Sequence, residues 1–342
     1  MTPTIHTDFD LTTLTTFGLR STARRYAEAA SLEDLRALFA DARLKGEPVR
    51  LLGGGANVIA GRTVEGLVVR VALTGMEVEE HPEGGMALTV GAGERLDDVV
   101  RKTLLEGWGG MEGLAAVPGT VGGAVVQNAG AYGVEVAEVL EWVEVWNPET
   151  DEVKRMSTEE CDFGYRTSVF KTPEGEKLVI LRAGLIVGRG AAHPKTDYKD
   201  LAQELERSGA DPKDPLAVEA AVRALRARKL PDPARIGNAG SFFKNPIVTQ
   251  VKARQLRTDY PMLVVYPLAG ARVKLAAGWL IQEAGFKGAV RGPVGGSENH
   301  ALILVNKGGA DAEDVKALRD EIVAAGEKRF GVTLEPEPVF WD

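Results

Sequence analysis

Residues 237–246 concentrate chemically useful side chains in the run Gly-Asn-Ala-Gly-Ser-Phe-Phe-Lys-Asn-Pro. The glycines and the alanine allow the backbone to approach a flat ligand closely. Ser241 follows them directly, so its hydroxyl would face that ligand, while Phe242 and Phe243 bury the returning chain. Such a run is untypical of a core strand and typical of a site. No histidine is in evidence to activate Ser241, which argues against a nucleophilic role.

Two glycine-rich stretches provide backbone N–H groups that no side chain obstructs. The first is Leu52-Gly53-Gly54-Gly55-Ala56-Asn57, and the second extends from residue 117 to residue 133. Successive free N–H groups can cradle an anion such as a pyrophosphate. The first stretch has neither the G-x-G-x-x-G spacing nor the Gly-Lys-Ser/Thr of a P-loop. A tight turn and a buried packing loop are the alternatives, but two such stretches in one chain favour a dinucleotide.

Three further groups of charged residues are candidates for a site. Arg166 follows Tyr165, although a lone arginine is often a surface ion-pair partner. Near the chain end, prolines fix the backbone around Glu335 and Glu337, and the apolar residues beside them favour a docked segment over a solvated tail. Arg226 and Lys229 share one helical face, where they would either stabilise a helix C-terminus or meet a phosphate.

Composition narrows the class of protein. The 342 residues suggest two or three domains. A net charge of −8 without a basic block argues against nucleic-acid binding. A single cysteine, Cys161, and four histidines predict neither a disulfide framework nor a metal site, and fit a reducing compartment.

Neither a secretory signal nor a membrane helix is expected. The N-terminus lacks a basic region followed by an apolar run. Residues 113–134 carry no charge and are long enough to span a bilayer, but their six glycines and Pro118 indicate an irregular loop. We therefore expect a cytoplasmic protein without a membrane, nucleic-acid or obligate protein partner.

The elements that must position these residues are read from hydrophobic periodicity and turn signals. A helix should begin after Ser31, where a capping-box-like pattern stands. The other predicted helices are 96–106, 216–228, 273–284 and 312–330. The predicted strands are 49–52, 67–71, 86–90, 139–146, 152–156, 178–187 and 301–306. Strands and helices mix without strict alternation, which indicates an α+β protein with a boundary near residues 208–215.

Nine runs, in order along nearly the whole chain, together resemble the UDP-N-acetylenolpyruvoylglucosamine reductase family. They are Thr15-Thr16-Phe17-Gly18, Leu52-Gly53-Gly54-Gly55-Ala56-Asn57-Val58, Gly91-Ala92-Gly93, Pro118-Gly119-Thr120-Val121-Gly122-Gly123, Asn128-Ala129-Gly130-Ala131-Tyr132-Gly133, Tyr165-Arg166-Thr167-Ser168-Val169-Phe170, Gly240-Ser241-Phe242-Phe243-Lys244-Asn245-Pro246, Ala276-Ala277-Gly278-Trp279-Leu280-Ile281 and Leu334-Glu335-Pro336-Glu337.

The resemblance implies a vanillyl-alcohol-oxidase-type FAD-binding domain of two lobes, followed by a C-terminal α+β substrate-binding lobe. The expected division is 1–71 for the first FAD lobe, with the tail 331–342 packing nearby, 72–214 for the second, and 215–330 for the substrate lobe. It further implies NADPH-dependent reduction of the enolpyruvyl ether of UDP-N-acetylglucosamine to UDP-N-acetylmuramate, a step of peptidoglycan precursor synthesis. The partners would be non-covalent FAD, NADPH as hydride donor and the UDP-sugar.

The resemblance also assigns residues. The implied catalytic trio is Ser241 as proton donor to a carbanion, Arg166 and Glu337. The implied cofactor contacts are Gly53, Gly54, Gly55, Asn57, Pro118, Gly119, Gly122, Gly123, Asn128, Gly130, Ala131 and Arg226. The implied substrate contacts are Tyr132, Tyr198, Lys229 and Asn245. The Tyr198 assignment departs from the family pattern, because Lys199 follows it where a glycine is expected.

Two alternatives belong to other classes. A sugar or hydroxy-acid oxidase of the same flavin fold would be reduced by its alcohol substrate and reoxidised by O₂. A non-enzymatic nucleotide-binding or scaffold protein would use the glycine loops for packing alone and would lack flavin absorbance. The chain end and the Ser241 run favour the reductase.

Overall fold

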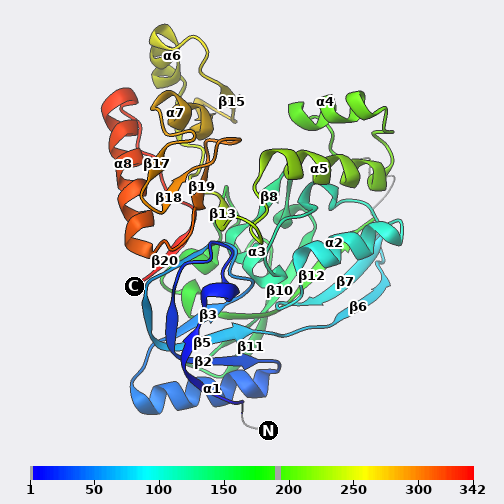
Figure 1. The fold of residues 1–342 in the computed structure, drawn as a ribbon. Coiled ribbons are helices and arrows are strands. Elements are labelled where there is room, and N and C mark those ends of the chain that lie inside the picture. Colours follow the sequence, from blue (N-terminus) through cyan, green and yellow to red (C-terminus); the bar gives the residue numbers. More distant parts are fainter. Residues whose placement is uncertain (1–2, 189–193) are drawn as a thin grey trace. The chain divides into compact units, whose positions relative to one another are not determined.

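The chain forms two compact units, each assembled from several segments. The computed structural model describes residues 3–188 and 194–342 (Figure 1). The first unit combines Met1–Phe9, Ala23–Gly55 and Glu65–Arg228. The second combines Asp10–Thr22, Ala56–Val64 and Lys229–Asp342.

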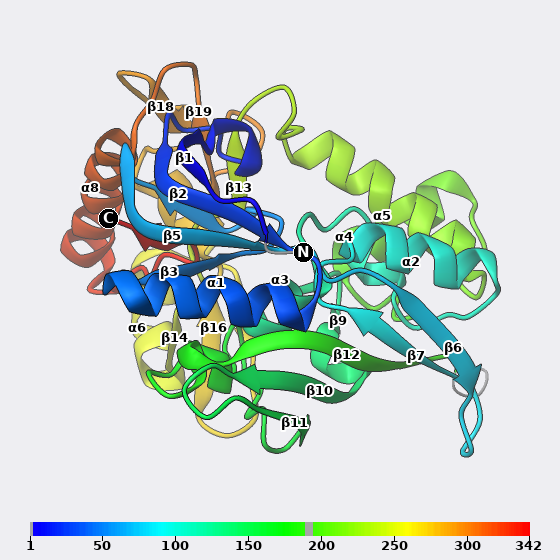
Figure 2. The same cartoon turned by 90° about the horizontal axis from the view of Figure 1, so that it is seen from below.

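A four-stranded sheet with one covering helix begins the first unit. The strand order is β1 (His6–Asp10), β2 (Thr22–Ala29), β5 (Thr63–Val71) and β3 (Val49–Leu52). Helix α1 (Leu32–Lys45) lies along this sheet (Figure 2). Its start is fixed by Ser31, whose Oγ accepts from the Asp34 N–H, as the capping pattern predicts. Leu35 and Leu38 then pack against Leu67 and Val69 of β5 in one hydrophobic core.

The larger sheet of the first unit has five antiparallel strands. Their order is β11 (Glu152–Ser157), β10 (Leu140–Asn147), β12 (Val179–Val187), β7 (Met86–Gly91) and β6 (Met76–Glu80). The helices of this part are α2 (Leu96–Leu105), α3 (Val121–Gln127), α4 (Lys199–Ser208) and α5 (Pro215–Lys229), and a two-stranded sheet joins β8 (Gly130–Ala131) to β9 (Val134–Glu135). Strands and helices share one core, so the glycine-rich loops between them sit on a rigid base.

The second unit is built on three small sheets. The first has the order β13 (Asn238–Ser241), β19 (Ile303–Asn306), β18 (Val294–Gly296) and β17 (Val290–Arg291). The second has the order β14 (Ile247–Thr249), β16 (Arg272–Leu275) and β15 (Val265–Pro267). In the third, β20 (Val339–Trp341) pairs in parallel with β4 (Val58–Ala60). The helices are α6 (Gln250–Asp259), α7 (Ala277–Glu283) and α8 (Ala312–Phe330).

Most of the predicted helices and strands are present in the structure. Helices 96–106, 216–228 and 312–330 correspond to α2, α5 and α8, and each predicted strand has a counterpart among the observed ones. Helix α8 has an unambiguous start, because Asp311 accepts hydrogen bonds from the Glu313 and Asp314 N–H groups in a capping box. Gly331 in the left-handed conformation ends it.

Three predictions were wrong. The run around Ser241 is a strand, β13, because its backbone pairs with β19 through an irregular register that Gly240 absorbs with φ of 68°. Residues 113–134 are not wholly irregular, since Thr120 caps the short helix α3. Residues 273–284 are not one helix: Val273 and Leu275 alternate inward in β16, and α7 begins only at Ala277.

Candidate active site

Ser241 and Glu337 are held close together by backbone hydrogen bonds within the second unit. The Glu337 N–H donates to the Phe242 carbonyl at 2.9 Å, and the Lys244 N–H donates to the Glu335 carbonyl at 2.9 Å. Phe242 and Phe243 are almost completely buried and anchor this ladder. Ser241 is exposed at the end of β13. Two parts of the chain that the sequence placed almost a hundred residues apart therefore form one polar edge.

Two predicted binding residues support this edge. Asn57 donates from Nδ2 to the Glu337 carbonyl at 3.1 Å, and its own carbonyl accepts from the Val339 N–H at 2.9 Å. Asn245 accepts at Oδ1 from the Ala277 N–H at 2.9 Å, at the start of α7 where the N-cap residue offers no side-chain acceptor. Asn57 thus orients the backbone at Glu337, and Asn245 orients the backbone at the start of α7.

Arg166 belongs to the first unit, and its guanidinium is held by the first residue of β8. Its Nη2 donates to the Gly130 carbonyl at 2.6 Å, and its guanidinium lies 5.2 Å from the centre of the Tyr165 ring. A Cβ at Gly130 would meet Arg166 Nη1 at 3.1 Å and Glu135 Cγ at 2.8 Å. Gly130 is therefore needed for the close approach of the arginine, whatever else it contacts.

The predicted cofactor glycines form a cradle of bare backbone in the first unit. A Cβ on Gly54 would lie 2.6 Å from Gly119 Cα, and a Cβ on Gly53 would lie 2.6 Å from Thr120 Oγ1. Two loops distant in sequence therefore approach backbone to backbone, with no side chain between them. Glycine backbone of this kind can present N–H donors to a pyrophosphate, so this part of the chain is compatible with FAD.

Replacing Gly54 with alanine should weaken FAD binding at least tenfold. The new Cβ would meet the backbone of Gly119, which cannot move aside as a flexible side chain can, and a strained contact of this kind typically costs about 1–3 kcal/mol. The measurement is the dissociation constant from flavin fluorescence on dilution of the holoenzyme. Gly278→Ala is the control, because its Cβ would meet only ordinary contacts at 3.4 Å or more. Equal affinities for the two variants would refute the cradle.

The remaining predicted cofactor residues surround this cradle in different ways. Asn128 is buried and has a left-handed backbone. Its side chain joins residues 135–137, through the Glu135 carboxylate and the Ala137 N–H, to the Gly164 carbonyl. It therefore holds the loop that carries Gly130 and Ala131 in β8. The backbone N–H of Gly122 donates to the Ala92 carbonyl at 2.9 Å. Gly55 is buried, whereas Pro118 and Gly123 are exposed.

Tyr132, Tyr198 and Arg226 gather in the first unit. The two tyrosine rings meet edge to face with centroids 5.4 Å apart. Burial raises the pKa of Tyr132, and the positive charge of Arg226 opposes that rise. Burial lowers the pKa of Arg226. The negative charge of Asp97 opposes this fall. Lys229 begins the last segment of the second unit.

Acid should loosen α4, the helix that Tyr198 precedes. Hydrogen bonds from Arg207 and then Arg228 lower the pKa of Glu204 to about 2, from an ordinary value of 4.5. Because the folded value is the lower one, the contribution of Glu204 to stability is complete above pH 4.5 and disappears as the pH falls towards 2. The stability difference between wild type and Glu204→Gln, from urea unfolding, should shrink over that range. Glu206→Gln, on the exposed side of α4, is the control. A difference that persists at pH 2 would contradict this role.

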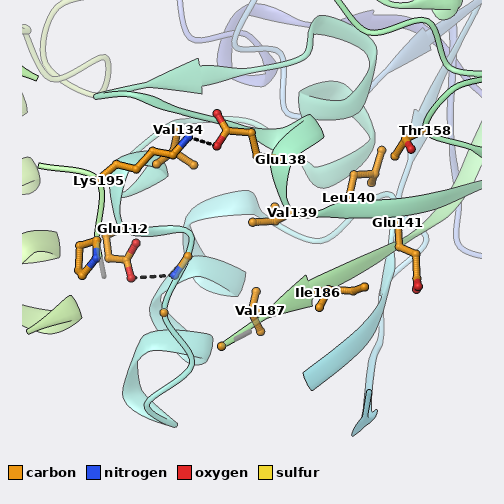
Figure 3. A pocket seen from close by; sticks show the side chains of 14 residues that line it. Glu112, Val134, Glu138, Val139, Leu140, Glu141, Thr158, Ile186, Val187 and Lys195 are labelled. Carbon is orange, nitrogen blue, oxygen red and sulfur yellow. Dashed lines mark hydrogen bonds and ion pairs between the residues drawn. The ribbon is translucent and has the colours of Figure 1, made fainter. Parts of the chain in front are cut away.

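A cavity of about 380 Å³ lies in the first unit, and none of the residues that line it is a predicted site residue. Figure 3 shows Glu112 bonded to the Gly110 N–H and Lys195 paired with Glu138 at its wall. Burial raises the pKa of Glu112 despite the hydrogen bond from Gly110. These polar groups satisfy one another, so the cavity shows no set of convergent groups for chemistry.

Neither a metal site nor a membrane-spanning helix is present within residues 3–188 and 194–342. No group of three or more histidine, cysteine, aspartate or glutamate residues in these ranges could hold a metal ion. No helix in the same ranges is long and apolar enough to cross a bilayer.

Sequence reasoning missed the charged residues that support the cofactor loops. Asp97 binds Arg223 in α5 and the Ala116 N–H. Glu219 stands one helical turn before Arg223 and binds it at 2.7 Å. The Glu-x-x-x-Arg spacing in 216–228 was a usable signal for that pair. Nothing in the sequence indicated its link to Asp97.

Known proteins similar to this chain provide independent evidence of its family. A model of the UDP-N-acetylenolpyruvoylglucosamine reductase C-terminal domain matches residues 232–341, and an FAD binding domain model matches residues 23–157. The UDP-N-acetylenolpyruvoylglucosamine reductase of Azoarcus sp. (strain BH72) is 45% identical over 340 residues, covering 98% of this chain and 97% of that protein. That of Pseudomonas aeruginosa is 43% identical over 324 residues, covering 94% and 95%.

Solved structures agree with these relatives. The UDP-N-acetylenolpyruvylglucosamine reductase from Thermus caldophilus is 27% identical, with a TM-score of 0.67 and full coverage of both chains. The 6-hydroxy-D-nicotine oxidase from Arthrobacter nicotinovorans is 12% identical, with a TM-score of 0.53, covering 97% of this chain and 86% of that one, and shows the fold alone. The predicted class, α+β with a vanillyl-alcohol-oxidase-type FAD-binding domain and a C-terminal substrate-binding lobe, is confirmed. The chain therefore belongs to the UDP-N-acetylenolpyruvoylglucosamine reductase family and is an FAD-containing oxidoreductase.

Proposed function

We propose that this enzyme reduces the enolpyruvyl ether of UDP-N-acetylglucosamine to UDP-N-acetylmuramate with NADPH, and that Ser241, Arg166 and Glu337 carry the chemistry. Identity to the curated reductases over nearly the full chain supports the reaction. The observation that supports the assignment of residues is the backbone pairing of residues 242–244, directly after β13, with residues 335–337, which keeps Ser241 and Glu337 close together.

FAD would be held by the Gly53–Gly55 turn and the loop around Gly119, with Arg226 as a cation for its negative groups or those of a nucleotide. When bound, FAD supplies the hydride that NADPH has delivered. The remaining implied contacts stay part of this proposal: Asn57, Pro118, Gly122, Gly123, Asn128, Gly130 and Ala131 for the cofactor, and Tyr132, Tyr198, Lys229 and Asn245 for the substrate.

The side chains of the protein then stabilise the developing negative charge and deliver one proton. Reduction at the terminal vinyl carbon of the substrate leaves negative charge on the neighbouring carbon, which spreads into the carboxylate. Preorganised donors stabilise such charge best in a site from which water is excluded. The planar guanidinium of Arg166 offers two parallel N–H donors to a carboxylate. Glu337, in its protonated form, would donate to the same group.

Ser241 completes the reaction by giving its hydroxyl proton to the carbanion. A serine hydroxyl is a weak acid in water, but a carbanion is basic enough to accept a proton from it, so position matters more than pKa. No histidine hydrogen-bonds Ser241 among the described residues, which suits a proton donor better than a nucleophile.

The assignment of chain segments to FAD binding and to substrate binding is also a proposal. We assign 1–71, with the tail 331–342, and 72–214 to FAD binding, and 215–330 to the substrate. We place the enzyme in the cytoplasm, where UDP-sugars and NADPH are available. No protein partner is needed for the reaction.

Anaerobic stopped-flow absorbance at the visible flavin band tests the function. NADPH should bleach the band, and the enolpyruvyl UDP-sugar, added second, should restore it. A sugar or hydroxy-acid oxidase would instead be bleached by an alcohol and recover with O₂. Failure of the UDP-sugar to restore the band would contradict the proposed substrate.

A further inference from the structure

The loop that enters the predicted FAD cradle is held in an unfavourable backbone conformation. Ala116 has φ of 57°, in the left-handed region that non-glycine residues avoid. Its N–H donates to Asp97 Oδ1 at 2.6 Å, and the Gly119 carbonyl three residues later accepts from the Leu96 N–H at 3.1 Å. Leu96 and Asp97 in the first turn of α2 therefore hydrogen-bond to the two ends of the segment from Ala116 to Gly119.

The same carboxylate also joins α2 to α5, beside a second ion pair between Arg101 of α2 and Glu219 of α5. Arg223 donates from Nη1 to Asp97 Oδ2 at 2.9 Å and from Nη2 to Oδ1 at 2.6 Å, a bidentate pair. Its Nε donates to Glu219 at 2.7 Å, and the side chain of Glu219 is only 2% exposed. Arg223 thus has its planar fork fixed on two sides, and Asp97 has both oxygens engaged.

Arg226 lies three residues beyond Arg223 and shares its face of α5. Tyr132 and Asp97 are close enough to Arg226 for their electrostatic effects to raise its pKa, against the lowering by burial. A shift of α5 would therefore move Arg226 relative to the loop.

We propose that Asp97 and Arg223 are a positioning pair that holds the loop from Ala116 to Gly119 and the Arg226 end of α5 in the arrangement that binds FAD. Neither residue is assigned a contact with the cofactor. The inference rests on the proposed cradle, because it assumes that this loop meets FAD.

Asp97→Ala should weaken FAD binding about tenfold, since it removes a charge-assisted contact and frees a strained loop. Asp97→Asn keeps an acceptor for the Ala116 N–H and loses only the ion pair, so its effect should be smaller. Arg223→Gln should match Asp97→Asn, and the double variant should be no worse than either alone. The measurement is the FAD dissociation constant from flavin fluorescence on dilution of the full-length holoenzyme.

A rescue distinguishes positioning from general destabilisation. Adding Ala116→Gly to Asp97→Ala should restore FAD affinity by threefold or more, because glycine adopts a positive φ freely and a non-glycine residue pays roughly five- to thirtyfold there. The thermal midpoint by circular dichroism, measured on the protein stripped of FAD, should not show the same recovery, because bound FAD would itself raise the midpoint. If Asp97→Ala does not fold, the comparison of Asp97→Asn with Arg223→Gln still decides the matter.

Arg207→Gln is the matched control. It removes another arginine from a buried glutamate, Glu204, and has no link to Ala116. Its FAD affinity should stay within about twofold of wild type. Unchanged affinity in Asp97→Asn and Arg223→Gln, or an equal loss in Arg207→Gln, would overturn the inference. Weakened binding by Gly54→Ala with no effect at Asp97 would refute the positioning pair and leave the cradle standing, whereas no effect of Gly54→Ala would refute the cradle itself.

Discussion

Ser241→Ala is expected to keep flavin reduction by NADPH and to lose turnover with the UDP-sugar by ~10²–10⁴-fold, the range typical of a lost proton donor. Ser241 is exposed at the end of β13, and its backbone is fixed by pairing with Ile303. Removing one oxygen therefore changes the chemistry of the position and leaves the strand intact. Stopped-flow absorbance separates the two half-reactions, because bleaching reports the first and recovery of the flavin band reports the second.

Thr258→Ala is the matched control for this prediction. Thr258 is an exposed hydroxyl of the same unit whose Oγ1 donates only to the Arg254 carbonyl one turn earlier in α6. Both half-reactions should stay at their wild-type rates in this variant. Recovery of the flavin band at a normal rate in Ser241→Ala would show that water or another group delivers the proton. Loss of the first half-reaction would instead indicate that Ser241 shapes the binding of NADPH.

Periodic segments were predictable because local and tertiary preferences agree in them. Helix α8 combines an aspartate cap, an apolar stripe and a terminal glycine, and each points to the same boundaries. Strand β13 was not predictable in this way. Its sequence, Asn-Ala-Gly-Ser, has little β propensity, and its pairing with β19 depends on a strand more than sixty residues later. Tertiary pairing decided the structure there.

The residue types of the proposed site could be predicted from the sequence, but the contacts that support them could not. Short runs predicted Ser241, Glu337 and the glycines as site residues because such residue types are unusual for a core. The supporting contacts join residues far apart in the chain, such as Asp97 with Arg223, which are 126 positions apart. A single sequence carries no signal for such a pair. The left-handed backbone of Ala116 was equally hidden, since alanine gives no hint of a positive φ.

Several predicted site residues share a strained backbone. Asn128, Tyr132 and Arg166 have φ of 43°, 47° and 57°. Asparagine tolerates this region because its side chain bonds nearby backbone groups, and Asn128 does so at the Ala137 N–H. Tyrosine and arginine have no such compensation, and each sparsely populated conformation costs about 1–3 kcal/mol. Glycine would adopt these two backbone conformations at a lower cost in free energy. The strain therefore arises from the presence of tyrosine and arginine side chains at these positions.

Arg166→Lys is expected to slow turnover by ~10²–10³-fold, as the loss of one preorganised donor to a developing negative charge does. The ammonium group keeps the positive charge, but it is a compact donor that cannot copy the planar fork of a guanidinium. Arg166 also donates from Nη2 to the Gly130 carbonyl at 2.6 Å, which fixes the plane of the guanidinium. A shorter, flexible lysine has one group to serve both the carbonyl and a substrate carboxylate.

The pattern of kinetic loss tests whether Arg166 stabilises the transition state. A fall in kcat together with kcat/KM indicates a contact made as charge develops, whereas a rise in KM alone indicates ground-state binding. Arg155→Lys is the control in the same unit, because Arg155 stacks on the Trp142 ring at 4.0 Å and pairs with Glu144. That variant should keep normal kinetics. If Arg166→Lys turned over at the wild-type rate and differed only in thermal stability, the arginine would serve to hold the Gly130 loop, and the enolate would need another cation.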